Sequence, residues 1–287
     1  MRRDLVIDGH DLAWEDFIYI AKVDKNRVSA DTSMDDIAGL MVELEARYDG
    51  EIAYVDDRLG RLFAHLGTLG IDTNTVVIVT GDHGESFGAH NTLGHSGLHE
   101  TVTHVPLWFR GPGIPSGIVV DVRTQQANIV PTILDLAHVQ PDLPYDLSGT
   151  SLVLLMAGKD SRVAEVVSCA ECSRQKTRSL YWRHWKFIRS LQDGARADGL
   201  PTRELYDLET DPLETNNLVD CRGDMAGEME DKLDTHIREE CEKVGRAEDV
   251  VLTTPLTSDL SACDDPSKFA FQLPPRSPES AKGACGH

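Results

Sequence analysis

Residues 74–95 read NTVVIVTGDHGESFGAHNTLGH. The apolar, β-branched run at residues 75–80 has no helical spacing and predicts a buried β-strand that ends in a glycine. Asp82, His83 and Gly84 follow it directly. A strand that displays a carboxylate and an imidazole at its end is typical of α/β enzymes, which place their chemistry at the carboxyl ends of strands.

The flanking segments predict an α/β domain. Residues 34–66 have helical spacing, with apolar side chains on one face at Ile52, Val55, Leu59, Leu62, Phe63 and Leu66. Residues 105–109 form a second apolar run that predicts another strand, and residues 125–137 predict a further helix. A helix that leads into a strand through a short connection is an α/β signature.

The composition changes near residue 158, and a second unit is predicted there. Short strands at 163–168, 179–185, 186–191 and 204–208 precede a helix at 225–244. This order predicts a small antiparallel sheet with a helix packed on it. We therefore expect an α/β part at 1–157, an α+β subdomain at 158–245, and a disordered tail at 246–287, which is rich in Pro, Ser, Asp and Thr.

Charge and hydropathy exclude two classes of partner. The chain has 287 residues and a formal net charge of −20, which repels phosphate backbones and disfavours nucleic-acid binding. No stretch approaches the roughly 20 apolar residues of a membrane span, and acidic residues interrupt the start, so no signal peptide is expected. These patterns predict a cytoplasmic chain with no membrane span.

The six cysteines do not indicate a disulfide framework, because their density is low and their spacings do not repeat. Cys169 and Cys172 form a C-x-x-C without a second pair at zinc-finger spacing. Ordinary thiols are the preferred interpretation of all six.

The central stretch carries the candidate chemistry. Asp82 and His83 are adjacent and could both reach one divalent cation, and Gly84 leaves room for a substrate or metal. His95 could bind or protonate an anionic group, with Glu85 as a partner that holds an imidazole. On these residues alone, the alternative of a turn aspartate beside an ordinary polar histidine is preferred; His90, His99 and His104 receive only that structural interpretation.

The wider pattern resembles the sulfatase family of the alkaline phosphatase superfamily. The segments YDGEIAYVDDRLGRLFAHL, GIDTNTVVIVTGDHGESFGAHNTLGH and HVPLWFRGPGI follow in the family's order and spacing. The resemblance continues through NIVPTILDLAHV, DLSGTSL and ELYDLETDPLETNNL, and so covers about residues 45–220. It implies a partial alkaline-phosphatase-like three-layer α/β/α sandwich with a small C-terminal subdomain of an antiparallel sheet plus a helix.

The resemblance also implies a site. Asp82 and His83 match the family's second pair of metal ligands, for a divalent metal that is usually Ca²⁺, with Mg²⁺ or Mn²⁺ as alternatives. His95 matches a residue that contacts the sulfate group and assists the leaving oxygen, which makes it both substrate-binding and catalytic. Asp56 and Asp57 lie in the helix, not at a strand end, and are expected to face solvent.

One part of the family pattern is missing from these 287 residues. Sulfatases use a formylglycine nucleophile made from Cys or Ser in C-x-P-S-R, and neither this motif nor the first strand with two aspartates occurs. We therefore interpret the chain as a carboxyl-terminal portion that lacks its nucleophile. We expect an exposed sheet edge and apolar helix face, and a separately encoded N-terminal half as a partner.

Three functions stay open. The preferred one is hydrolysis of small-molecule or carbohydrate sulfate esters with a divalent metal. The second is a phosphonate or phosphate ester hydrolase, or a phosphoryl transferase, of the same superfamily. The third is a non-catalytic remnant, which the missing nucleophile favours.

Overall fold

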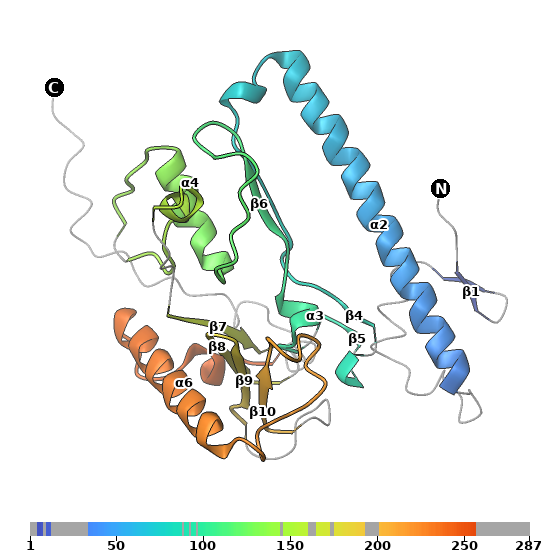
Figure 1. Ribbon diagram of the computed structural model, residues 1–287, viewed down its shortest axis with the longest axis vertical. Helices are drawn as coiled ribbons and strands as arrows, with labels where there is room; N and C mark the ends of the chain where they lie inside the picture. Colours follow the sequence, from blue (N-terminus) through green and yellow to red (C-terminus); the bar gives the residue numbers. More distant parts are fainter. Residues whose placement is uncertain are drawn as a thin grey trace.

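The computed structural model describes residues 5–7, 10–12, 34–87, 89–91, 93–95, 97–143, 146–159, 165–172, 175–192 and 201–256. Figure 1 shows a body built around a long helix and a strand pair, with a four-stranded sheet and a helix below it. The first elements along the chain are β1 (Leu5–Ile7), β2 (His10–Leu12), α2 (Met34–Leu69), η1 (Asp72–Asn74), β3 (Val77–Thr80), β4 (Ser86–Phe87), η2 (Ala89–Asn91), β5 (Leu93–Gly94), α3 (Glu100–Thr103) and β6 (Leu107–Arg110). After them come η3 (Gln126–Asn128), α4 (Ile129–Leu136), α5 (Val153–Met156), β7 (Val166–Glu171), β8 (Thr177–Trp182), β9 (Trp185–Ser190), β10 (Arg203–Asp207), α6 (Gly223–Lys243) and α7 (Val250–Thr253).

The upper body has helices on both sides of the strand pair β3–β6, which is antiparallel with Val79 opposite Trp108. Helix α2 lies on one side, where the ring of Phe63 meets that of Trp108 edge to face with a centroid separation of 6.0 Å. Helix α4 lies on the other side in Figure 1. This arrangement of helix, strands and helix agrees with the predicted α/β/α layering.

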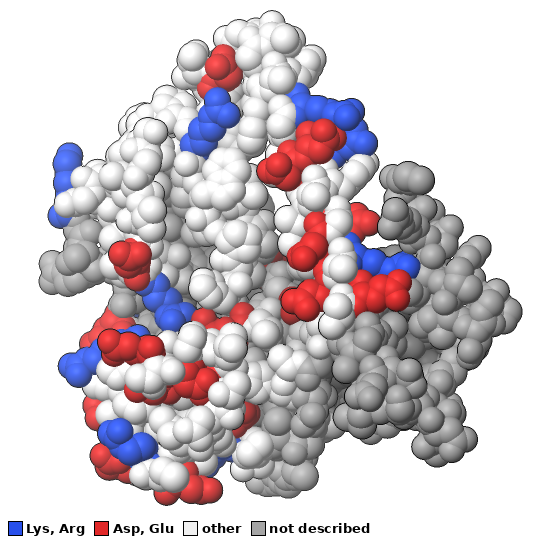
Figure 2. Space-filling model, turned by 45° about the vertical axis from the view of Figure 1, so that its right-hand side comes forward, with Lys and Arg blue, Asp and Glu red and all other residues white. Residues whose placement is uncertain are grey.

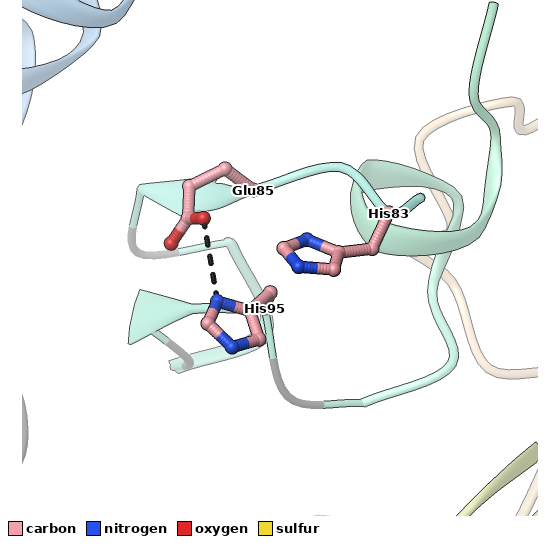
Figure 3. A group of neighbouring side chains, drawn as sticks. All are labelled: His83, Glu85 and His95. Carbon is pink, nitrogen blue, oxygen red and sulfur yellow. Dashed lines mark ion pairs between the residues drawn. The ribbon is translucent and has the colours of Figure 1, made fainter. Parts of the chain in front are cut away.

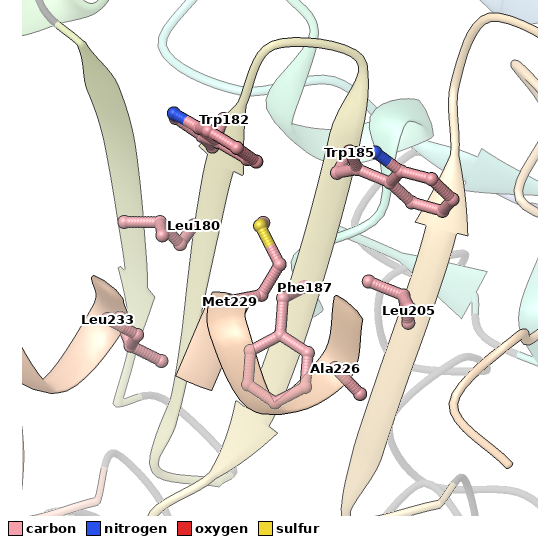
Figure 4. Packing of buried hydrophobic residues seen from close by; sticks show 8 residues of the cluster. All are labelled: Leu180, Trp182, Trp185, Phe187, Leu205, Ala226, Met229 and Leu233. Carbon is pink, nitrogen blue, oxygen red and sulfur yellow. The ribbon is translucent and has the colours of Figure 1, made fainter. Parts of the chain in front are cut away.

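The lower subdomain is an antiparallel sheet in the order β10–β9–β8–β7, with α6 packed on one face. Side chains alternate along each strand, so one face turns toward α6 and the other toward the loop after β5. The cluster between sheet and helix consists of Leu180, Trp182, Trp185, Phe187, Leu205, Ala226, Met229 and Leu233 (Figure 4). The predicted antiparallel sheet with a covering helix is therefore present, with boundaries shifted by one to three residues.

Two expectations need correction. Strand β3 is half-buried, not buried, because β6 is its one strand neighbour among the described residues. The expected start of the disordered tail, at residue 246, is also too early. Residues 246–256 contain α7 and pack on the sheet. Asp249 caps α7 by accepting a hydrogen bond from Val251 N at 3.0 Å, and it forms an ion pair with Arg178 of β8. Residues 257–287 lie outside the described part of the chain.

The predicted apolar face of α2 is exposed along much of its length. Ile52 and Val55 are 55% and 53% exposed, and Leu62 is 48% exposed. Charged side chains gather on the lower subdomain and along α2, whereas much of the upper body is uncharged (Figure 2). Within the described residues, no helix combines the length and the apolar character that a bilayer crossing requires.

Candidate functional site

The candidate site lies where β3 ends, in the turn formed by Gly81, Asp82 and His83. The side chain of Gln126 in η3 holds this turn, because its Nε2 donates to Gly81 O at 2.9 Å and to Asp82 O at 2.7 Å. The short helix after β6 is thus connected directly to the strand end, which fixes the backbone that carries the two candidate ligands.

Asp82 and His83 present their polar atoms to the same space. Asp82 Oδ2 lies 3.6 Å from His83 Nε2, and the Asp82 carboxylate is exposed. The backbone N–H of His83 donates to Asp82 Oδ1 at 3.0 Å and is the main cause that lowers the pKa of Asp82. His83 Nδ1 lies 2.9 Å from Gly84 O, so the tautomer with a proton on Nδ1 leaves the Nε2 lone pair open toward Asp82.

His95 and Glu85 complete the cluster (Figure 3). The imidazoles of His83 and His95 stack with centroids 4.2 Å apart and an interplanar angle of 23°. Glu85 Oε2 lies 3.6 Å from His95 Nδ1. One ligand atom each from His83, Glu85 and His95 lies within 4.8 Å of the others, a spacing that small side-chain rotations could close around a divalent cation.

Gly84 is the position where the turn meets the next element most closely. Its N–H donates to Val102 O at 2.7 Å, and an added Cβ would lie 2.1 Å from Thr101 O. No side chain can occupy that space without moving the backbone of α3 at Thr101 and Val102. The glycine therefore allows the site turn to pack directly on the α3 segment.

Substitution of Gly84 by alanine is expected to lower the free energy of unfolding by about 1–3 kcal/mol, because the methyl group must displace backbone atoms. The matched control is Gly60→Ala in the exposed part of α2, where an added Cβ meets nothing within 4 Å. That change is expected to stabilise the helix by about 0.5–1 kcal/mol. Urea unfolding of both variants measures the two effects, and equal midpoints for both would contradict the packing argument.

The loop after His95 is attached to the lower sheet by buried polar contacts. Gly97 N donates to Glu171 Oε2 at 3.0 Å, and the fully buried His99 pairs with Glu204 at 3.0 Å. The ring of His90 stacks on that of His99 with centroids 3.7 Å apart. Burial, and then the neighbouring His99, lower the pKa of His90. His90 and His99 thus have structural partners, in agreement with the expectation for them.

The family comparisons match nearly the whole described chain. The family model described as N-sulphoglucosamine sulphohydrolase, C-terminal, matches residues 88–243, which is more than half of the chain. The model described as Sulfatase matches residues 13–139. The chain belongs to the sulfatase family.

Individual sulfatase-family relatives agree with this assignment. Human arylsulfatase K is 33% identical over 186 residues, which are 61% of this chain and 33% of that protein. The chain spans about a third of the length of the curated relatives that it matches.

Two solved structures are also similar to this chain. A phosphonate monoester hydrolase of Agrobacterium radiobacter is 28% identical with a TM-score of 0.60, over 72% of this chain and 43% of that one. The protein BT4656, solved with its substrate D-glucosamine-2-N,6-O-disulfate, has 24% identity and a TM-score of 0.56, over 65% and 39% of the two chains. The second of these likenesses concerns the fold alone.

Within this sulfatase-family fold, the structure brings three of the residues singled out in the sequence close together. Asp82 is next to His83, and His83 stacks on His95. Asp56 and Asp57 are exposed on α2, and Asp57 pairs with Arg61 at 3.0 Å, so neither belongs to this cluster.

Sequence analysis did not identify the buried charges that support the site loop. Lys186 is fully buried and lies 3.2 Å from Glu100 and 2.6 Å from Glu214. The sequence signal for this buried ion pair is a lysine between Trp185 and Phe187 in a predicted strand. A charge on a buried strand needs an oppositely charged partner.

Proposed function

We propose that Asp82 and His83 are two ligands of a divalent cation, and that this chain forms part of a site for sulfate-ester hydrolysis. The observation that carries this proposal is the pairing of Asp82 Oδ2 and His83 Nε2, 3.6 Å apart at the exposed end of β3. An oxygen and a nitrogen donor at this spacing fit one divalent ion. When bound, such an ion supplies Lewis-acid polarisation of the ester.

In this proposal, the side chains at the site have separate roles in metal binding and in catalysis. Glu85 holds His95 Nδ1, which leaves His95 Nε2 for a substrate oxygen. In our proposal His95 contacts the sulfate group of a small-molecule or carbohydrate ester and protonates the leaving oxygen. The lowered pKa of Asp82 keeps its carboxylate ionised, as a metal ligand requires.

The identity of the ion is part of the proposal. We favour Ca²⁺, with Mg²⁺ or Mn²⁺ as alternatives, on the family resemblance. Ca²⁺ takes six to eight oxygen ligands, so Asp82 and His83 form only part of its shell. The remaining ligands must come from elsewhere. The partner that we propose is an N-terminal half that supplies further carboxylates.

Metal titration of the purified chain tests the ligand roles. Asp82→Ala and His83→Ala are each expected to weaken the affinity for Ca²⁺ by about tenfold or more, since each removes a direct donor. His65→Ala is the matched control, because His65 is exposed on α2 and belongs to neither of the candidate ligand groups. Unchanged affinity in both site variants would favour a non-catalytic remnant over an enzyme.

A phosphonate monoester hydrolase is the second candidate. It is favoured by the 28% identity to the Agrobacterium radiobacter enzyme of that name over 72% of this chain. Parallel assays with an aryl sulfate and an aryl phosphonate, on an assembly that contains a nucleophile, separate the two activities by the product released.

A further inference from the structure

A second group of potential metal ligands lies at one end of the lower sheet, away in sequence from Asp82 and His83. Trp182 pairs with Trp185, so Arg183 and His184 form the two-residue turn between β8 and β9. Asp207, the last residue of β10, pairs with Trp185 on the other side of β9. The register of three neighbouring strands therefore places His184 beside the end of β10.

Glu209 joins these two residues to form a mixed nitrogen and oxygen donor set. The two ring nitrogens of His184 lie near different carboxylates, with Nε2 4.0 Å from Asp207 Oδ1 and Nδ1 3.9 Å from Glu209 Oε2. One of these two nitrogens, and not both, would bind the ion. One ligand atom from each of the three residues lies within 4.8 Å of the other two. Neighbouring donors around a divalent ion with bonds of about 2.0–2.2 Å are about 3–3.5 Å apart. Closing the remaining gap requires the side chains to turn so that both carboxylates meet the same nitrogen of His184.

The backbone holds this group in place. Leu208 N donates to His184 O at 2.8 Å and so ties the hairpin turn to the end of β10. Glu209 N donates to Asp207 Oδ1 at 3.1 Å, which fixes the turn that carries both carboxylates. The imidazole of His184 also packs against the indole of Trp185, with centroids 5.0 Å apart. The three donors are thus oriented by contacts that do not depend on an ion.

The electrostatics of the group favour a cation. The Asp207 side chain is 19% exposed, so its carboxylate is largely removed from water. Within the described part of the chain, His184 is the one basic side chain within ion-pair distance of Asp207 or Glu209. The two carboxylates create a local negative charge that no lysine or arginine of the described residues pairs with. A bound divalent ion would offset it.

We propose that His184, Asp207 and Glu209 form a second divalent-cation site, for ions of the Mn²⁺ or Zn²⁺ class. One imidazole with two carboxylates suits these ions, which accept mixed nitrogen and oxygen donors. The site shares no residue with the Asp82 and His83 pair and does not depend on the function proposed above. Its location at the hairpin end of the sheet suits a role in stabilising the lower subdomain, because a bound ion would link the β8–β9 turn to β10.

Mn²⁺ binding to the full chain tests this site. The parent is the double variant Asp82→Ala/His83→Ala, which removes the first candidate site. The probe is Mn²⁺ alone, followed by the loss of the free-ion paramagnetic resonance signal, because Mn²⁺ prefers oxygen and nitrogen donors to the thiols of this chain. The parent is expected to bind one Mn²⁺. Adding His184→Ala or Glu209→Gln is expected to weaken that binding by about tenfold or more.

The controls separate ligand loss from unfolding. Glu209 is 75% exposed, so its amide variant should leave the fold unchanged, which circular dichroism checks. Glu248→Gln, at another exposed glutamate, should retain the parent affinity. A parent that binds no Mn²⁺ up to about 1 mM, the weak limit of a specific site, would overturn the proposal. Parent-like binding in both His184→Ala and Glu209→Gln would overturn it as well.

Discussion

Lys186→Met is expected to lower the free energy of unfolding by about 3–5 kcal/mol, because it leaves the buried Glu214 carboxylate without its cation and leaves Glu100 with Arg123 as its cation. Lys186 Nζ lies 2.6 Å from Glu214 Oε1 as an ion pair that lacks good hydrogen-bond angles, and 3.2 Å from Glu100 Oε1. Glu214 Oε2 also accepts the backbone N–H of Glu100 at 2.6 Å. The lysine on β9 therefore stabilises the α3 segment that follows the site loop.

The pH dependence gives a second readout of the same ion pair. Burial of Glu100 opposes its ionisation, but Lys186, Tyr181 and Arg123 outweigh burial and hold the pKa of Glu100 below its ordinary value. A lowered folded-state pKa adds stability above the ordinary glutamate value, and this stability is lost as the pH falls through the folded pKa. The stability difference between the natural chain and Lys186→Met should therefore shrink as the pH is lowered below about 4.3.

Urea unfolding at several pH values measures both effects. Lys243→Met is the control, because Lys243 is 66% exposed and its pair with Glu240 is worth at most about 1 kcal/mol. Adding Glu214→Gln to Lys186→Met should recover part of the lost stability, since it removes one unpaired buried charge. Equal losses for Lys186→Met and Lys243→Met would show that the buried pair does not stabilise the fold.

Much of the fold could be predicted from the sequence because its periodicities are strong and local. The alternation in the strands of the lower sheet and the four-residue steps in α6 each predict an element within a few residues of its position. Helix α7 was missed because it has a single turn within a stretch rich in polar residues. Its stability comes from the contact between Asp249 and Arg178, which are far apart in the sequence, so no local pattern signals it.

For the same reason, only part of the candidate site could be predicted from the sequence. Asp82, His83 and Glu85 are local to the end of β3, so sequence proximity predicts their grouping. The stacking of His95 on His83 depends on how the β4–β5 hairpin returns, which no local pattern predicts; the family resemblance implied a role for His95 but not this contact. Lys186 and Glu100 meet across two subdomains, and only the tertiary structure brings them together.

The exposed apolar side chains of α2 give a reason to expect a partner surface. Ile52, Val55 and Leu62 are about half exposed on one helix, although amphipathic helices normally bury such a stripe. The chain spans about a third of the length of its curated relatives, so much of the family's sequence has no counterpart in these residues. We propose that an N-terminal sulfatase segment covers this face and also supplies the nucleophile and further metal ligands.

The described chain alone is expected to show no sulfate-ester turnover above a buffer blank, because its 287 residues contain no C-x-P-S-R nucleophile motif. Co-expression with an N-terminal sulfatase segment that carries a matured formylglycine is expected to produce an assembly that releases sulfate from an aryl sulfate. In that assembly, Asp82→Ala should lower kcat/KM by about a hundredfold or more, since a metal ligand acts on charge in the transition state.

The matched control for this loss is Asp57→Ala, which removes an exposed aspartate of α2 that pairs with Arg61. It should retain the activity of the parent assembly, because an exposed ion pair of this kind contributes little. Turnover by the chain alone at the rate of the assembly would contradict the need for an external nucleophile. An active assembly that is insensitive to Asp82→Ala would instead contradict the ligand role of Asp82 while still supporting the need for an N-terminal segment.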